Sequence, residues 1–168
     1  PRAFDRYYND HFGFREMLIS VYNKIMLDWF NMSPSEKVIL GKNDFLFYHS
    51  EKGRDAYVIK DYLGRVPFSD KDLKVVKNTL EKYYSIYKKH NIPVAFLICP
   101  NKTSIYGENL PDRLRKSRGK TRLDQLTESI DIRRFSVIDL REELLSAKEK
   151  YPVYFKTDTH WNKYGSYI

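Results

Sequence analysis

An apolar run in the middle of the chain constrains the fold more than any other feature of the sequence. Residues Val94 to Cys99 are all apolar, which is the pattern of a strand buried on both faces. A helical pattern leads directly into this run. Ser69 and Asp72 form a capping box at its start, and apolar residues then recur at three- and four-residue intervals until Pro93. A helix followed directly by a buried strand predicts a parallel α/β sheet.

The same order of elements is repeated further along the chain. Thr121 and Asp139 are each followed, three residues later, by an acidic residue, so each can begin a helix with a capping box. Strands are expected over residues 135–138 and 153–155, after the first and the second of these helices. The fold class that we predict is therefore α/β, with a parallel sheet flanked by helices.

The beginning of the chain has a different pattern. Residues 14–30 place apolar residues at helical spacing and predict an amphipathic helix with one buried face. Residues 38–40 and 45–48 flank a turn of Gly, Asn and Asp residues, which predicts a β-hairpin. The stretch after the hairpin indicates a loop with one short element. We expect one domain, with an N-terminal part over residues 1–68 and an α/β portion over residues 69–168.

The composition is that of a folded domain with a strong positive charge. Hydrophobic residues make up 42% of the 168 residues, and no apolar run is long enough to span a membrane. The formal net charge of +8 favours an anionic partner such as nucleic acid, a phosphate polymer or a polyuronate. The single cysteine, Cys99, excludes an internal disulfide, and its place in the apolar run predicts a buried, inert thiol. The chain begins with Pro1 instead of Met, so we expect a processed or excised piece.

Polar residues follow two of the expected strands. Asn101 and Lys102 come after the strand at 94–99, and Asp158 and His160 come after the last strand. Because parallel sheets place their chemistry beyond the carboxyl ends of the strands, both pairs could converge on one crevice. The Asp158 carboxylate can accept the Nδ1 proton of His160, fix its tautomer and raise the basicity of Nε2. The alternative is a surface aspartate that caps a helix beside a histidine.

A cationic run lies between the two pairs. It comprises Arg113, Arg115, Lys116, Arg118, Lys120 and Arg122. The run can bind a polyanionic glycan, or it can be a solvated loop between two elements. Trp29 and Trp161 are interpreted as core residues instead of sugar-binding platforms.

Four segments of the chain, in the same order, are similar to those of the AlgX/AlgJ family of SGNH hydrolase-like proteins, which O-acetylate bacterial exopolysaccharides. They are residues 9–16, 38–48, 94–106 and 157–162. The string Asp158-Thr159-His160-Trp161 is the most specific of the matching elements. Together the segments cover nearly the whole chain.

The resemblance implies a flavodoxin-like three-layer fold that is incomplete at its C-terminus, and a catalytic triad in which the serine follows the other two residues. Asp158 would be the orienting acid and His160 the general base. The serine has no counterpart here, because the chain has neither Gly-Asp-Ser nor Gly-x-Ser-x-Gly, and Ser166 lies on a helix expected after Trp161. We therefore expect the front part of a larger catalytic domain, which is inactive alone and prone to self-association. Asn101 and Lys102 would bind substrate near the oxyanion.

The function implied by the resemblance is O-acetyl transfer to, or hydrolysis from, a bacterial surface polysaccharide such as alginate. The implied partners are an acidic polysaccharide, an acetyl donor and a membrane-bound acetylation protein, in the periplasm or at the cell surface, with no cofactor or metal ion. The main alternative is a non-catalytic glycan-binding or assembly component with the same fold. Nucleic-acid binding has only the charge in its favour. A metal hydrolase is disfavoured because His11, His49 and His90 lack ligand spacing.

Overall fold

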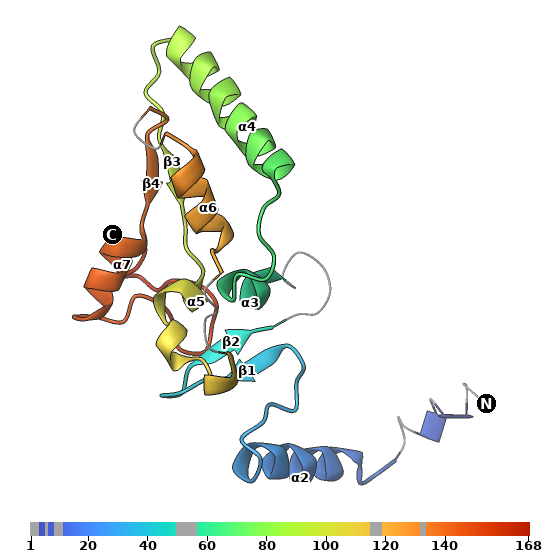
Figure 1. The fold of residues 1–168 in the computed structure, drawn as a ribbon. Helices are drawn as coiled ribbons and strands as arrows, with labels where there is room; N and C mark the ends of the chain where they lie inside the picture. Colours follow the sequence, from blue (N-terminus) through green and yellow to red (C-terminus); the bar gives the residue numbers. More distant parts are fainter. Residues whose placement is uncertain (1–3, 6, 9–11, 50–56, 115–118, 132–133) are drawn as a thin grey trace.

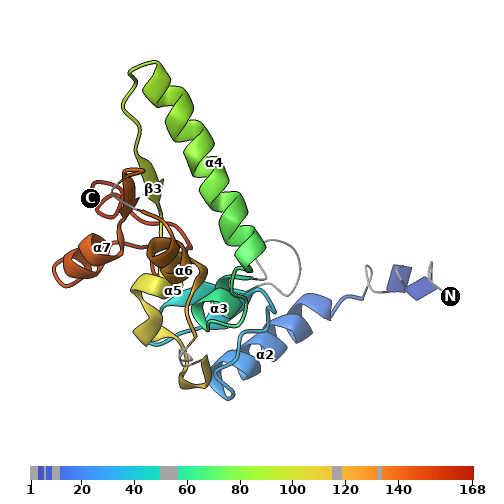
Figure 2. The same cartoon turned by 45° about the horizontal axis from the view of Figure 1, so that its top comes forward.

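The computed structural model describes residues 4–5, 7–8, 12–49, 57–114, 119–131 and 134–168. The helices are α2 (Arg15–Asp28), α3 (Tyr57–Tyr62), α4 (Asp70–Lys89), α5 (Lys102–Ile105), α6 (Arg122–Ser129) and α7 (Arg141–Lys148), with short 3₁₀ turns η2 (Gly107–Asn109) and η3 (Asp112–Leu114). The strands are β1 (Val38–Leu40), β2 (Leu46–Tyr48), β3 (Phe96–Ile98) and β4 (Val137–Asp139). Figures 1 and 2 show how they are arranged.

The predicted α/β portion forms around a parallel pair of strands. β3 pairs with β4, with Leu97 opposite Ile138. The two capping boxes predicted before α4 and α6 are both present, on Ser69 and Thr121. The ring of Tyr84 on α4 meets the buried ring of Phe135 edge to face, with centroids 5.6 Å apart, and so attaches the long helix to the chain entering β4.

The prediction that the strand at 94–99 is buried on both faces is wrong. Phe96 and Ile98 are half-buried, whereas Leu97 is 53% exposed and its partner Ile138 is 43% exposed. Cys99 is also exposed, which corrects the expected buried thiol. The reason is that, in the described part of the chain, the sheet has two strands and is packed on one face, so alternate side chains point to solvent.

The predicted third strand at 153–155 does not join the parallel sheet. Tyr154 forms a single antiparallel bridge with Trp161, flanked by the bonds from Phe155 N to His160 O (3.2 Å) and from Asn162 N to Val153 O (3.0 Å). The chain therefore folds back on itself between 155 and 160 instead of extending along β4. The helix expected after Trp161 is a run of turns over 163–167.

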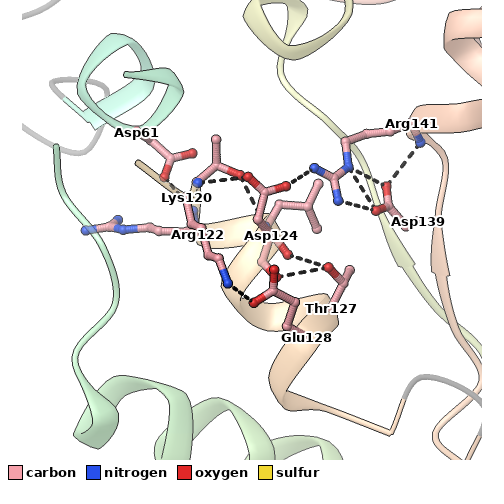
Figure 3. A network of polar contacts seen from close by, with 10 residues as sticks. Asp61, Lys120, Arg122, Asp124, Thr127, Glu128, Asp139 and Arg141 are labelled. Carbon is pink, nitrogen blue, oxygen red and sulfur yellow. Dashed lines mark hydrogen bonds and ion pairs between the residues drawn. The ribbon is translucent and has the colours of Figure 1, made fainter. Parts of the chain in front are cut away.

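The helix expected to be capped by Asp139 begins differently. The N-cap of α7 is Leu140, because the Asp139 carboxylate accepts from the backbone N (3.1 Å) and guanidinium of Arg141 instead. Figure 3 shows that Arg141 also pairs with Asp124 at the start of α6. Burial opposes ionisation of Asp124, but hydrogen bonds from Arg141 and Thr121 lower its pKa to about 2. This network ties β4 and α7 to α6.

The hydrophobic core lies beyond the carboxyl end of β3, where the hairpin, α3, α5, α7 and the chain at 153–154 meet (Figure 1). It comprises Ile39, Phe45, Phe47, Ile59, Leu63, Ile105, Tyr106, Leu110, Leu140, Leu144, Val153 and Tyr154. The hairpin is the one predicted, and its turn places Asn43 and Asp44 at positive φ, which these two residues tolerate. Trp161 packs against this core, as predicted.

Helix α2 forms as predicted, but the expected buried face is wrong. None of its residues is buried, and Trp29 at its end is 80% exposed instead of lying in a core. The spacing of apolar residues identifies the stripe but not what covers it, and Figure 1 draws α2 apart from the core. Within the described ranges, no helix has both the length and the apolar character required to cross a membrane.

Candidate functional site

The Asp158 and His160 side chains are hydrogen-bonded at the tip of the turn between Phe155 and Trp161. Nδ1 of His160 lies 2.6 Å from Oδ1 of Asp158, and the same oxygen accepts from the backbone N of His160 at 3.0 Å. The predicted contact is therefore confirmed. It forms because two residues this close in a tight turn bring the carboxylate onto both nitrogens.

Both side chains of the pair are open to solvent, at 54% exposure for Asp158 and 78% for His160. The backbone N–H of His160, followed by its ring, lowers the pKa of Asp158, so the carboxylate is ionised at neutral pH. An ionised Asp158 favours the proton on Nδ1 and leaves the lone pair on Nε2. The pair can therefore act as an oriented base.

A cavity of about 420 Å³ lies beside His160. It is lined by Phe47, Tyr48, Val58, Asn101, Lys102, Thr103, Thr159 and His160. The expectation that the residues after β3 and the Asp158–His160 pair converge is thus confirmed. Pro100 ends the extended segment and α5 starts at Lys102, so the turn out of β3 delivers three consecutive side chains to this cavity.

Lys102 is 4% exposed, and its ammonium is engaged with backbone oxygens. Nζ donates to the carbonyl oxygens of Leu46 (2.8 Å), Lys156 (2.7 Å) and Asp158 (3.0 Å). Burial lowers the pKa of Lys102 to about 8, although the charge of Asp158 opposes this. The substrate-binding role stays a prediction, and in the observed geometry three protein carbonyls occupy the three N–H donors.

The neighbours of Lys102 differ in how their polar groups are placed. Asn101 is exposed and precedes α5, but its side chain does not cap that helix, so its predicted contact with substrate stays a prediction. Thr103, which the sequence did not single out, is 3% exposed, and its Oγ1 has no hydrogen-bond partner among the described residues. No sequence signal distinguishes this threonine from a core residue.

Two tyrosines attach the turn to the rest of the site. Tyr154 Oη donates to the Pro100 carbonyl at 2.5 Å, and the backbone N of Val153 donates to Tyr106 Oη at 3.0 Å. Burial raises the pKa of Tyr154 to about 12, so its hydroxyl remains a donor. Both residues escaped the sequence reasoning, and the 14 tyrosines in the chain make any one of them inconspicuous.

The cationic run is divided by the structure. Arg113 is exposed on η3, while Arg115, Lys116 and Arg118 lie outside the described residues. Lys120 pairs with Glu128 at 2.5 Å. Arg122 lies against the rings of Tyr57 and Phe68, at 4.9 and 5.0 Å, and donates from Nε to the Val66 carbonyl. Arg122 thus has a structural role, and glycan binding by the others stays a prediction.

The site can accept a proton, and the hydroxyl groups of its described lining belong to Tyr48, Thr103 and Thr159. Among the described residues that line the cavity there is no serine. Ser166 is exposed and its Oγ donates to the Lys163 carbonyl at 3.0 Å. Across the described ranges, the His, Cys, Asp and Glu side chains form no group of three that could hold a metal ion.

Comparison with known proteins gives a consistent set of relatives. The model of the family described as "SGNH hydrolase-like domain, acetyltransferase AlgX" matches residues 38–168. The "Probable alginate O-acetylase AlgJ" of Azotobacter vinelandii is 22% identical over 166 residues, which are 99% of this chain and 40% of the relative. The protein of the same name from Pseudomonas syringae pv. tomato is 23% identical over 167 residues, with the same coverage. The chain thus spans about two fifths of the length of these relatives. No solved structure matches it.

Proposed function

The chain belongs to the family of the SGNH hydrolase-like domain of the acetyltransferase AlgX, and from this premise we propose that it supplies the base of a serine O-acetyltransferase acting on a bacterial polysaccharide. The observation that carries the proposal is the 2.6 Å contact between Nδ1 of His160 and Oδ1 of Asp158 beside a cavity. A histidine oriented in this way is the base that a serine hydroxyl requires in order to attack an acyl group.

In the proposed reaction, Nε2 of His160 removes the proton of a serine hydroxyl as the serine oxygen attacks the acetyl carbonyl of the donor. The tetrahedral intermediate collapses, and the leaving group of the donor takes the proton back from His160. A sugar hydroxyl then attacks the acetyl-serine and loses its proton to His160. As the second tetrahedral intermediate collapses, the serine oxygen leaves and takes that proton back, and the sugar is released as its acetyl ester. Asp158 holds the ring and stabilises the imidazolium in both halves, and the Asn101 amide is the candidate donor to the oxyanion.

We propose that the serine belongs to a segment that is not among the residues lining the cavity. Support comes from the absence of a nucleophile-elbow motif in the sequence and from the greater length of the relatives. The same reasoning leads us to propose a flavodoxin-like three-layer sheet for the whole domain. The exposed pair Leu97 and Ile138 on one face of the sheet is consistent with a further layer there.

We propose an acidic polysaccharide as the acceptor, at an extracytoplasmic location and together with an acetyl donor and a membrane-bound acetylation partner. The names of the relatives and the formal charge of +8 support this choice. Replacing Arg113, Arg115 and Arg118 by Gln should weaken binding to alginate in a low-salt titration and flatten its salt dependence. Unchanged binding would leave the solvated-loop interpretation of this run.

The function is tested in the full-length protein by measuring hydrolysis of an acetylated chromogenic ester and acetyl transfer to alginate. His160→Ala should lower turnover by roughly 10³-fold or more, because the triad loses its base. His90→Ala is the matched control, since this histidine follows α4 and is exposed, and it should have wild-type activity. A wild-type protein that binds alginate but neither hydrolyses nor transfers acetyl would favour the non-catalytic alternative.

A further inference from the structure

The buried Lys102 ammonium joins three segments that are distant in sequence. Its three acceptors are the carbonyls of Leu46 in β2 and of Lys156 and Asp158 in the turn, and Nζ lies 5.1 and 5.2 Å from the ring centroids of Phe45 and Phe47. We propose that Lys102 is the positioning residue of the Asp158–His160 pair, which holds the backbone of the turn so that His160 faces the cavity. This inference rests on the proposed function for its catalytic consequence.

The chemistry of the contact favours lysine specifically. An ammonium carries three N–H donors on one atom, which is the number of carbonyls that converge here. The Lys156 carbonyl also accepts from Leu46 N at 2.8 Å, so this backbone hydrogen bond aligns the turn with β2 independently of the Lys102 ammonium. The Asp158 carbonyl is the contact that matters for catalysis, because it belongs to the residue whose carboxylate orients His160.

A purely structural role is a poor explanation for a charge at this position. A buried ammonium costs desolvation energy, and an apolar side chain beside the Phe45 and Phe47 rings would avoid that cost. What an apolar side chain cannot do is draw the Lys156 and Asp158 carbonyls inward. The exposed half of the turn has its own hydrogen bonds between Asp158 and His160, but the Asp158 backbone from which they start is held in place by the Lys102 ammonium.

The protonation of Lys102 offers a way to detect this role. The charged and titratable groups around it are Asp158, His160 and Lys156 of the turn, Tyr48 of β2, and Asp44, which pairs with Lys156 at 3.8 Å. Burial lowers the pKa of Lys102 to about 8. Above that pH a neutral amine offers two donors and a lone pair to three carbonyls, so one contact is lost.

The pH dependence of global stability has the opposite sign to the pH dependence expected for the Lys102 contacts and for activity. The amine binds its proton more tightly in the unfolded chain, with a pKa of 10.5, than in the folded protein, with a pKa of about 8. Between these two values the contribution of Lys102 to the free energy of unfolding rises with pH. Loss of activity through pH 8 with no fall in melting temperature would therefore separate positioning from general loosening of the fold.

The test measures the ring ¹⁵N shifts of His160 by NMR, and kcat and KM between pH 6 and pH 10, in the full-length protein. In the wild type the Nδ1–H tautomer should give way above about pH 8 and kcat should fall with it. Lys102→Met should show the disrupted tautomer at every pH and lower kcat by about 10²-fold with little change in KM. Lys102→Arg, whose charge does not titrate in this range, should shift the alkaline loss of kcat beyond pH 10.

Lys156→Met is the matched control, because it removes an exposed lysine side chain from the same turn and leaves its carbonyl in place. It should keep both the tautomer and the pH profile of the wild type. Wild-type ¹⁵N shifts that do not change through pH 8, or a folded Lys102→Met with wild-type shifts, would overturn the positioning role. If the wild type lacks turnover altogether, the proposed function fails, and the ¹⁵N titration still decides the role of Lys102.

Discussion

The two walls of the cavity are held in different ways. The Lys102 wall, which comprises Phe47, Lys102 and Thr103, is buried, with exposures of 2%, 4% and 3%. The histidine wall, which comprises Thr159 and His160, is exposed. Bonds between distant segments fix the first wall, whereas bonds within a single turn form the Asp158–His160 pair of the second.

The difference shows that one wall provides rigid geometry, while the other leaves His160 accessible to a reacting group. A base that removes a proton from another group must present Nε2 to that group, so its side chain cannot be packed away. The buried wall can supply the fixed geometry that the exposed wall lacks, because the Lys102 ammonium donates hydrogen bonds to the backbone carbonyls of the turn. The comparison predicts that changes in the exposed wall affect activity, while changes in the buried attachment, apart from those at the positioning residue Lys102, affect stability first.

The sharpest test of the exposed wall is Asp158→Asn. The amide cannot accept the Nδ1 proton as a carboxylate does, so the tautomer is no longer fixed and turnover of an acetyl ester should fall by about 10⁴-fold. The melting temperature should remain near that of the wild type, because the side chain is 54% exposed. Asp44→Asn, at an exposed carboxylate paired only loosely with Lys156 at 3.8 Å, is the control. A large loss of stability in Asp158→Asn would contradict the prediction that changes in the exposed wall affect activity without affecting stability.

The attachment of the turn is tested by Tyr154→Phe. The Pro100 carbonyl would lose its buried hydroxyl donor, so the free energy of unfolding should fall by about 1–2 kcal/mol in a urea titration. Tyr167→Phe removes a hydroxyl from a residue that is 94% exposed and should leave stability unchanged. Equal stability of the two variants would show that the turn is held without this bond.

The residues Asp124, Asp139 and Arg141 of the network in Figure 3 do not line the cavity, so the smallest effect on activity is expected there. Asp124→Asn should lower the free energy of unfolding at pH 7 by about 1 kcal/mol, a value that allows for screening at a partly exposed ion pair, with little effect on turnover. Because the pKa is lowered from 3.8 to about 2, this stabilisation is present above pH 3.8 and is lost as the pH falls through 2. Thermal melts of both proteins between pH 2 and pH 7 measure the difference. Glu128→Gln, at an exposed ion pair, is the control, and an equal loss there would contradict the prediction.

Local signals in the sequence predicted more of the structure than long-range ones did, although the capping box expected at Asp139 did not form. The capping boxes at Ser69 and Thr121 and the hairpin depend on residues a few positions apart, and all three form as predicted. The Asp158–His160 contact is local in the same sense. The strand expected at 153–155 was wrong because an apolar triplet does not specify its partner, and that partner is the chain around Trp161.

Burial was the least predictable property. Apolar content alone placed Cys99 and Trp29 in a core, but exposure depends on which other segments cover them, and both are exposed. Conversely, Lys102 is charged and nevertheless buried, because backbone carbonyls from two other segments compensate it. No spacing rule within the chain could have indicated contacts of this kind.

The position of Lys102 in the chain has a consequence for the order of folding. It lies 56 residues after Leu46 and 56 residues before Asp158, and it contacts both. The Asp158–His160 contact closes a loop of two residues and can form early, whereas the cavity requires two long loops to close on one side chain. During synthesis His160 can therefore contact Asp158 as soon as both residues leave the ribosome. The cavity beside His160 forms later, when Lys102 contacts both Leu46 and Asp158.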